Sequence, residues 1–219
     1  MTEARQSSQL AKIQAEMTEK RGRAWAFPTL TGERTALIGC EVSRLGLALA
    51  PRLRSSIPRI DWLARTLRSS GGVALWSHFA PNAFDGPAGE ILGEADVATM
   101  RQRLGDASWT EVNEGIQESG NDQVFSRPGY SAMTNDLISA LKKADAGTIL
   151  LAGAETDGAI ESTARAAANE GLRVIVIGDC CISSDDTAHI GALTALHRRI
   201  ADVRPVDEVV AELRRNMAS

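Results

Sequence analysis

The sequence has no hydrophobic run that approaches the roughly 20 residues needed to cross a membrane as a helix. Its amino terminus is polar and charged, without the apolar segment of a secretory signal. Basic residues form no block, and 24 lysines and arginines are outnumbered by 28 acidic residues. We therefore expect a cytoplasmic protein that binds neither a membrane nor nucleic acid.

Cysteine is scarce, because the sequence has only Cys40, Cys180 and Cys181. An odd number of cysteines without a secretion signal argues against a disulfide framework. Neither these cysteines nor the three histidines have the spacing of metal ligands. The sequence also contains no GxGxxG, no Walker loop and no HExxH motif. We expect no disulfide, no metal and no cofactor.

What the sequence does contain is an alternation of short apolar runs with amphipathic stretches. This alternation predicts a parallel sheet covered by helices on both faces, and near-continuous apolar strands are typical of such a sheet. The fold class is therefore α/β, a three-layer α/β/α domain with a mostly parallel sheet of six strands. The expected strands are TALIGC, VALWSHF, DQVFS, TILLAGA, LRVIVIGD and ADVRPV, and the expected helices lie within residues 57–72, 135–147 (starting at Asn135), 156–171, 185–201 and 207–216.

Two segments stand apart from this alternation. Residues 1–24 hold a helix that ends at Gly22 and has a narrow apolar stripe of Leu10, Ile13 and Met17. Such a helix packs on a partner subunit or on a neighbouring face, and we expect an oligomer contact and a homo-oligomer. The main domain then covers residues 25–219. Residues 80–121 lack periodicity, which is typical of a functional or lid-like stretch.

Ligands in parallel sheets bind at the carboxyl ends of the strands. Three segments that contain such ends resemble the isochorismatase-like hydrolase superfamily of cysteine hydrolases: TALIGCEVSR, FSRPGYSAMTNDLISAL and GAETDGAIESTARAAANEGLRVIVIGDCC. The resemblance extends over about residues 30 to 215, and the third segment is its most specific part. It implies the fold of that superfamily and a tendency to assemble into oligomers.

The catalytic positions of that family carry other residues in this sequence. By resemblance, the family's acid falls on Glu41, its lysine on Arg127 and its nucleophilic cysteine on Ala159. Alanine has no atom that could attack a carbonyl carbon, so cysteine amidase chemistry is not expected. The guanidinium of Arg127 stays charged and can bind a carboxylate. In an apolar cleft the pKa of Glu41 should be raised unless this cation lies beside it. The pair could equally be a structural ion pair.

The turn after the fourth strand begins a helix whose free N–H groups favour an anion. The resemblance implies that this turn forms an oxyanion hole after a cis peptide bond near Ala154–Glu155. The predicted ligand-binding residues are His78, Phe84, Tyr130, Glu155, Thr156 and Ala159. Packing is the alternative for the alanine and the aromatic residues, and a satisfied structural histidine is the alternative for His78.

Three functions follow from these residues. The first is a hydrolase- or lyase-like enzyme that acts on a small carboxylate- or amide-containing metabolite without a thiol, with Glu41 as acid or base and Arg127 as anion anchor. True isochorismatases are the precedent, since their acid protonates a vinyl ether. The second is an inactive relative that binds a small molecule or scaffolds a partner. The third is residual hydrolysis through Cys180 or Cys181, which are more often core residues. By analogy, a degenerate family member suggests secondary metabolism.

Overall fold

The computed structural model describes the backbone of residues 3–217 and the side chains of residues 10–217, so part of the predicted segment 1–24 lies outside the described residues. Six strands form one sheet in the order β3-β2-β1-β4-β5-β6, and every neighbouring pair is parallel. The predicted α/β fold is confirmed. The strands are β1 (Thr35–Cys40), β2 (Val73–Phe79), β3 (Gln123–Arg127), β4 (Thr148–Ala154), β5 (Arg173–Ile182) and β6 (Asp202–Arg204).

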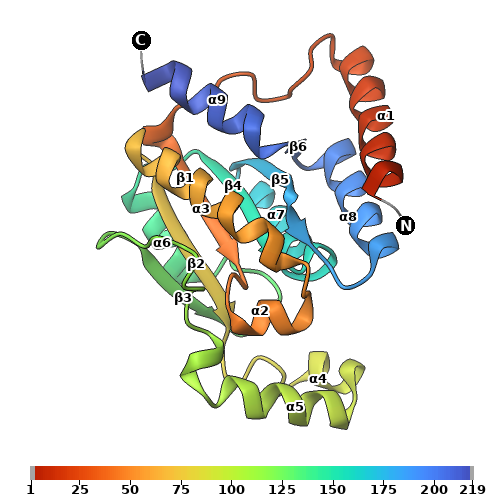
Figure 1. Ribbon diagram of the computed structural model, residues 1–219, viewed down its shortest axis with the longest axis vertical. Coiled ribbons are helices and arrows are strands. Elements are labelled where there is room, and N and C mark those ends of the chain that lie inside the picture. The colour runs from red at the N-terminus through yellow and green to blue at the C-terminus, as the bar shows by residue number, and fades with distance from the viewer. Residues whose placement is uncertain (1–2, 218–219) are drawn as a thin grey trace.

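Helices cover both faces of this sheet (Figure 1). One apolar cluster joins one face to α3 and α9, and a second joins the other face to α6, α7 and α8. Alternate residues of β1, β2, β4 and β5 enter the two clusters, as the two-residue period of a strand requires. The α-helices are α1 (Glu3–Arg21), α2 (Arg44–Leu49), α3 (Leu53–Ser69), α4 (Pro87–Leu92), α5 (Glu94–Leu104), α6 (Asn135–Lys143), α7 (Glu161–Asn169), α8 (Asp186–Arg199) and α9 (Val206–Met217).

The carboxyl ends of the strands meet a third, smaller cluster that the sequence did not indicate. It joins α2, α4 and α5 around Leu45 and Phe84. Residues 80–121 were predicted as irregular, and this prediction is wrong for α4 and α5. Helix α5 buries only Val97, Met100 and Leu104, which is the spacing of one helical face. Its short length and the turn at Gly93 obscured that period. Figure 1 shows α4 and α5 below the sheet, next to α2.

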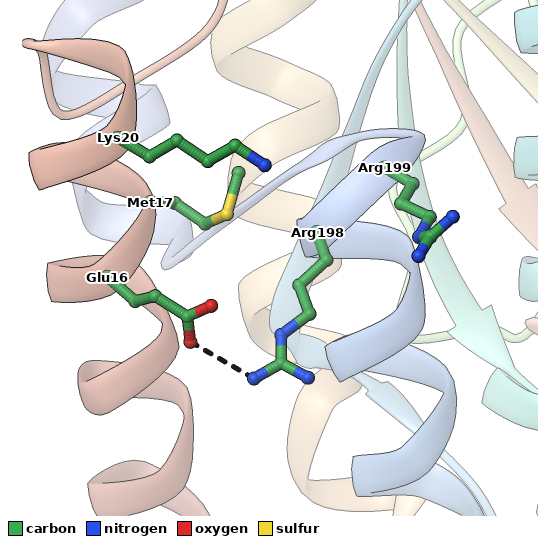
Figure 2. Close-up of a pocket in the computed structure, with 5 residues that line it drawn as sticks. All are labelled: Glu16, Met17, Lys20, Arg198 and Arg199. Carbon is green, nitrogen blue, oxygen red and sulfur yellow. Dashed lines mark hydrogen bonds and ion pairs between the residues drawn. The ribbon is translucent and has the colours of Figure 1, made fainter.

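Helix α1 lies against α8 of the same chain. Its predicted apolar stripe is buried there, with Ile13 and Met17 at 4% and 5% exposure. Figure 2 shows Glu16 of α1 and Arg198 of α8 facing each other, and their ion pair of 3.0 Å edges a shallow pocket of about 520 Å³. The stripe therefore packs on a neighbouring face, and the oligomer contact stays a prediction. None of the helices in the described part of the chain is both long and apolar enough to span a membrane.

Candidate functional site

Glu41 follows β1 directly and sits in a constrained backbone position. Its φ is 49°, in the left-handed region that few residues other than glycine adopt. Its N–H donates to the carbonyl of Ser77 in β2 over 2.8 Å. Its own carbonyl lies so close to Gly46 of α2 that a Cβ there would stand 1.7 Å from the oxygen. Gly46 thus leaves the space that the carbonyl of Glu41 occupies, and the hydrogen bond to β2 fixes the backbone of Glu41.

The carboxylate of Glu41 is buried against Arg127, as the sequence suggested. Its Oε1 accepts hydrogen bonds from the backbone N–H of Phe79 (2.6 Å) and from Nη2 of Arg127 (2.8 Å). Its Oε2 has only a long contact of 3.5 Å with the Ser43 hydroxyl. Both Glu41 and Arg127 have no exposed surface. One carboxylate oxygen is therefore well satisfied, and the other is only weakly engaged.

Arg127 is also incompletely satisfied. Its Nη1 donates to the carbonyl of Gly129 over 2.8 Å, and its guanidinium carbon lies 3.7 Å from the centre of the Phe79 ring. Its Nε–H has no hydrogen-bond partner among the described residues, although it is buried. A buried donor without a partner is rare in folded proteins, so this atom points to a group that the protein itself does not supply.

Burial raises the pKa of Glu41 from 4.5 to about 7, because the charge of Arg127 and the N–H of Phe79 offset only part of the lost hydration. Near neutral pH the side chain therefore exists in both protonated and ionised forms. A carboxyl group with such a pKa can give or take a proton under physiological conditions.

Three aromatic rings lie beside this pair. The ring centre of Phe79 is 4.9 Å from that of Phe84 and 5.6 Å from that of Tyr130. Tyr130 is half-buried, and burial together with the charge of Glu155 raises its pKa. His78 is half-buried, its Nδ1 donates to the carbonyl of Phe79 over 2.9 Å, and burial lowers its pKa. The structure thus brings Phe84 and Tyr130 together, whereas the hydrogen bond of the His78 ring is with the backbone.

The turn after β4 has the form that the resemblance implied. The peptide bond Ala154–Glu155 is cis, and a π-helical turn, Thr156–Ile160, leads into α7. Glu155 is half-buried, and burial and the neighbouring charge of Asp157 raise its pKa. Two carboxylates therefore flank the helix start that was expected to favour an anion.

The remaining predicted residues of this turn point to packing as much as to binding. Ala159 is 1% exposed and belongs to the apolar cluster of α6, α7 and α8. Thr156 is fully buried, and its hydroxyl is 2.7 Å from Nδ1 of His189 in α8. The tyrosine ring of Tyr130 lies close over Gly158, where an added Cβ would be 3.2 Å from it. Tyr130 therefore lies against the turn.

The three cysteines are buried, and none forms a hydrogen bond with Glu41 among the described residues. Burial raises the pKa of the Cys40 thiol to about 11. Burial also raises the pKa of Cys180 and of Cys181 above their usual range. Since β5 extends through Ile182, Cys180 faces the cluster of α3 and α9 and Cys181 the opposite cluster. These are protonated core thiols.

Sequence reasoning missed two parts of this region. Ser43, which contacts Oε2 of Glu41, also caps α2 by accepting from the N–H of Gly46. Serine is a common helix cap, so Ser43 could have indicated the start of α2, but the sequence analysis did not predict this helix. His189 was assigned no role, although it bonds Thr156. No group of three potential metal ligands gathers within residues 3–217, and the expectation of a metal-free protein stays a prediction.

Comparison with known proteins agrees with this geometry. The family model described as the isochorismatase domain matches residues 35–208. The isochorismatase family protein YecD of Escherichia coli O157:H7 is 33% identical over 107 residues, which is 48% of this chain and 57% of YecD. The chain thus matches little more than half the length of that relative.

Solved structures show the same fold at low identity. A cysteine hydrolase from Pseudomonas syringae pv. phaseolicola superposes with a TM-score of 0.75 at 19% identity, covering 85% of this chain and 95% of that one. An isochorismatase family protein from Burkholderia thailandensis gives 0.70 at 22% identity, covering 85% and 98%. N-carbamoylsarcosine amidase from Thermoplasma acidophilum gives 0.66 at 22% identity, covering 80% and 97%.

Proposed function

This chain belongs to the isochorismatase family, and from that premise we propose that it acts on a small carboxylate- or amide-containing metabolite by acid–base chemistry that requires no thiol. One observation carries the proposal. In the Glu41–Arg127 pair, Oε2 of the acid has only a long contact and Nε–H of the cation has none among the described residues. The pair is therefore one acceptor and one donor short, and a substrate that accepts and donates a hydrogen bond would complete it.

Glu41 is the proton donor in this proposal. With the proton on Oε2, its Oε1 keeps the hydrogen bonds from Phe79 and Arg127. Transfer of that proton to a substrate atom leaves a carboxylate that Arg127 stabilises. A pKa of about 7 suits both the loss and the return of the proton at neutral pH. Because Ala159 supplies no nucleophile, water takes that role.

Arg127 is the anchor, and its Nε–H is the group offered to a substrate oxygen. Glu155 interacts electrostatically with both Glu41 and Arg127, and its own neighbour Asp157 adds a further negative charge. A neutral amide oxygen suffers less repulsion there than a carboxylate does. Within the proposed substrate class we therefore favour the amide.

The second candidate is a binding protein without turnover. It is favoured by the complete burial of Glu41 and Arg127 behind Phe79, Phe84 and Tyr130. A substrate reaches the pair only if this aromatic cluster moves. The two candidates differ in whether any substrate is converted.

The test is a turnover screen of small amides and carboxylates with the wild-type protein and with Glu41→Gln. We expect Glu41→Gln to lose at least about 100-fold in kcat, the usual contribution of a general acid, with an unchanged circular dichroism spectrum. Glu161→Gln, at an exposed pair with Arg165 on α7, is the matched control and should keep full activity. Equal turnover by the wild type and Glu41→Gln would refute the role of Glu41 as the general acid. Binding without turnover in the wild type, altered by Glu41→Gln, would favour the binding protein.

A thiol route through Cys180 or Cys181 is tested separately with iodoacetamide and mass spectrometry. We expect the folded protein to keep its activity and all three cysteines to react only after unfolding, since they are buried and their pKa values are raised. Loss of activity in step with alkylation of either residue would replace the proposed mechanism by thiol chemistry.

A further inference from the structure

Residues 80–113 leave the sheet after β2, and both ends of this segment are fixed beside the candidate site. At its start, the N–H of Ala80 donates to the carbonyl of Arg127 over 2.7 Å. At its end, the N–H of Asn113 donates to the carbonyl of Val42 over 2.8 Å, one residue after the acid of the pair. The segment therefore starts and finishes at the site and carries α4 and α5 between these two points.

The segment reaches the buried pair through one aromatic side chain. The ring centre of Phe84 is 4.9 Å from that of Phe79, whose ring in turn lies 3.7 Å from the guanidinium carbon of Arg127. Helix α4 packs directly on the backbone of Phe84, because a Cβ added at Gly89 would stand 2.2 Å from the Phe84 carbonyl oxygen. A displacement of α4 would therefore displace Phe84 as well.

The helices of this segment are held by a small core. Helix α5 buries only Val97, Met100 and Leu104, and Ile91 of α4 is 88% exposed. In the described part of the chain, α5 packs mainly on α4 and on the short turn Ala107–Trp109. Figure 1 shows both helices below the sheet and outside its two helical layers. Regions with few buried apolar contacts open at a lower free-energy cost than the core does.

Trp109 joins these helices to α2, which packs against the acid of the pair. Its ring centre is 4.3 Å from the guanidinium carbon of Arg44 in α2 and 5.0 Å from that of Arg103 in α5. Both distances lie within the roughly 6 Å over which a cation is attracted to an aromatic ring. Arg44 also donates to the hydroxyl of Ser108 over 3.4 Å. One half-buried ring thus connects the two sides of the segment.

We propose that residues 80–113 are a hinged cap that opens to admit a substrate to the buried acid–base pair, and that Trp109 is the positioning residue that holds this cap closed. Opening separates Phe84 from Phe79 and uncovers the carboxyl and guanidinium groups, and closure excludes water from them. The inference rests on the proposed function for the substrate that the cap admits. The movement itself can be measured without any substrate.

The measurement uses a water-soluble carbodiimide and glycinamide at pH 6, with the labelled carboxyl groups identified by mass spectrometry. Glu41 has no exposed surface and should react only when the cap opens. Asp202 is equally buried, in β6, and should react only when the sheet itself opens. Each rate is divided by that of the same carboxyl group in the urea-unfolded protein. In the wild type we expect Glu41 to react at least about tenfold faster than Asp202, because local opening costs less than global unfolding.

Variants of Trp109 test its role in closure. Trp109→Ala should raise the labelling rate of Glu41 about tenfold, the effect of losing two cation–π contacts, and leave Asp202 unchanged. Trp109→Phe keeps a ring beside both arginines and should stay within about threefold of the wild type. Trp62→Ala is the matched control, since the Trp62 ring of α3 lies 5.5 Å from the guanidinium carbon of Arg214 in α9. It should leave the ratio of the Glu41 rate to the Asp202 rate unchanged.

The proposal is overturned if Glu41 reacts no faster than Asp202 in the wild type, if Trp109→Ala leaves the Glu41 rate unchanged, or if either tryptophan variant raises both rates equally. Its failure can be told apart from that of the acid–base function. A protein that opens as expected but converts no substrate keeps the cap and loses the function. Turnover that depends on Glu41, together with unchanged labelling in Trp109→Ala, would do the reverse.

Discussion

Two regions of the molecule bury an arginine beside a carboxylate, but they satisfy the two carboxylates differently. At the ends of β1 and β3, Glu41 faces Arg127, and both strong donors reach the same oxygen, Oε1. In β6, Asp202 faces Arg204 and is fully buried as well. Its Oδ1 accepts from Arg21 and from the N–H of Ala26, at 3.1 and 3.0 Å. Its Oδ2 accepts from Arg204 and from the N–H of Phe27, both at 3.0 Å.

The difference separates a structural clamp from a reactive pair. Asp202 ties α1 and the segment after it to the sheet through both of its oxygens. Glu41 leaves Oε2 almost free, and its backbone has a left-handed conformation. Local strain of this kind persists where the surrounding structure imposes it, and it is concentrated at functional sites. A buried ion pair alone therefore says little about role, whereas the number of donors on each oxygen does.

The largest expected effect is a loss of stability when Asp202, which ties α1 and the segment after it to the sheet, is replaced. Each carboxylate oxygen of Asp202 accepts from two donors. In Asp202→Asn the amide NH2 group must replace one of these oxygens, so it would meet two N–H donors without an acceptor. Breaking a buried charged network in this way costs about 3–5 kcal/mol. Urea unfolding followed by circular dichroism measures the loss. Glu41→Gln should lose far less at pH 7, because its amide oxygen can keep both donors at the Oε1 position. Equal losses would remove the distinction between the two regions.

The difference in unfolding free energy between the wild type and Glu41→Gln should depend on pH, because only the wild type has the titrating carboxyl group. The pKa of Glu41 rises from 4.5 in the unfolded chain to about 7 in the folded protein, so the folded state binds the proton more tightly. Its stabilising contribution is complete below pH 4.5 and is lost as the pH rises through 7. The wild type should lose on the order of 3 kcal/mol relative to Glu41→Gln across this range. Urea titrations from pH 4.5 to 8 measure the difference, and a constant difference would contradict the raised pKa.

The sequence predicted the sheet well because β1, β2, β4 and β5 contain continuous apolar runs. The end of β5 was placed at Asp179, whereas the strand continues to Ile182, because two small buried cysteines carry no boundary signal. Helix α6 begins at Asn135 as predicted, but its cap is Thr134, whose hydroxyl accepts from the N–H of Leu137 and which the sequence analysis did not name. Boundaries depend on such single hydrogen bonds, which composition does not specify.

For the candidate site, the resemblance assigned the family's acid to Glu41 and its lysine to Arg127, and the structure places Glu41 directly after β1 and Arg127 at the end of β3. The sequence did not indicate the Asp202 clamp, whose donors at Arg21, Ala26 and Phe27 are distant in sequence and share no motif. Arg21 comes from α1, which packs on α8 of the same chain, a contact that only the tertiary structure shows.

A smaller effect is expected from the glycine that lets α2 approach Glu41. In Gly46→Ala the new Cβ would meet the carbonyl oxygen of Glu41 at 1.7 Å, so the backbone must shift. Overpacking of this kind costs about 1–3 kcal/mol, more than alanine gains over glycine in a helix. Gly191→Ala in α8 is the matched control, since nothing lies within 4 Å of its added Cβ. It should stabilise the protein by up to about 1 kcal/mol. Thermal unfolding of both variants should show opposite shifts, and a shared sign would mean that Glu41 is not held by this contact.

The smallest effect is expected where an ion pair stands in water. Arg34 and Asp145 lie 3.5 Å apart with side-chain exposures of 63% and 80%. Asp145 also has a positive φ, of 48°, but asparagine tolerates that conformation nearly as well. Asp145→Asn should therefore change the unfolding free energy by no more than about 0.5 kcal/mol. Set beside Asp202→Asn, the same chemical substitution would then differ several-fold in its effect. Because the replaced group is identical, that ratio can come only from burial and from the donors that each carboxylate accepts, and a large loss in Asp145→Asn would show that charge alone explains both.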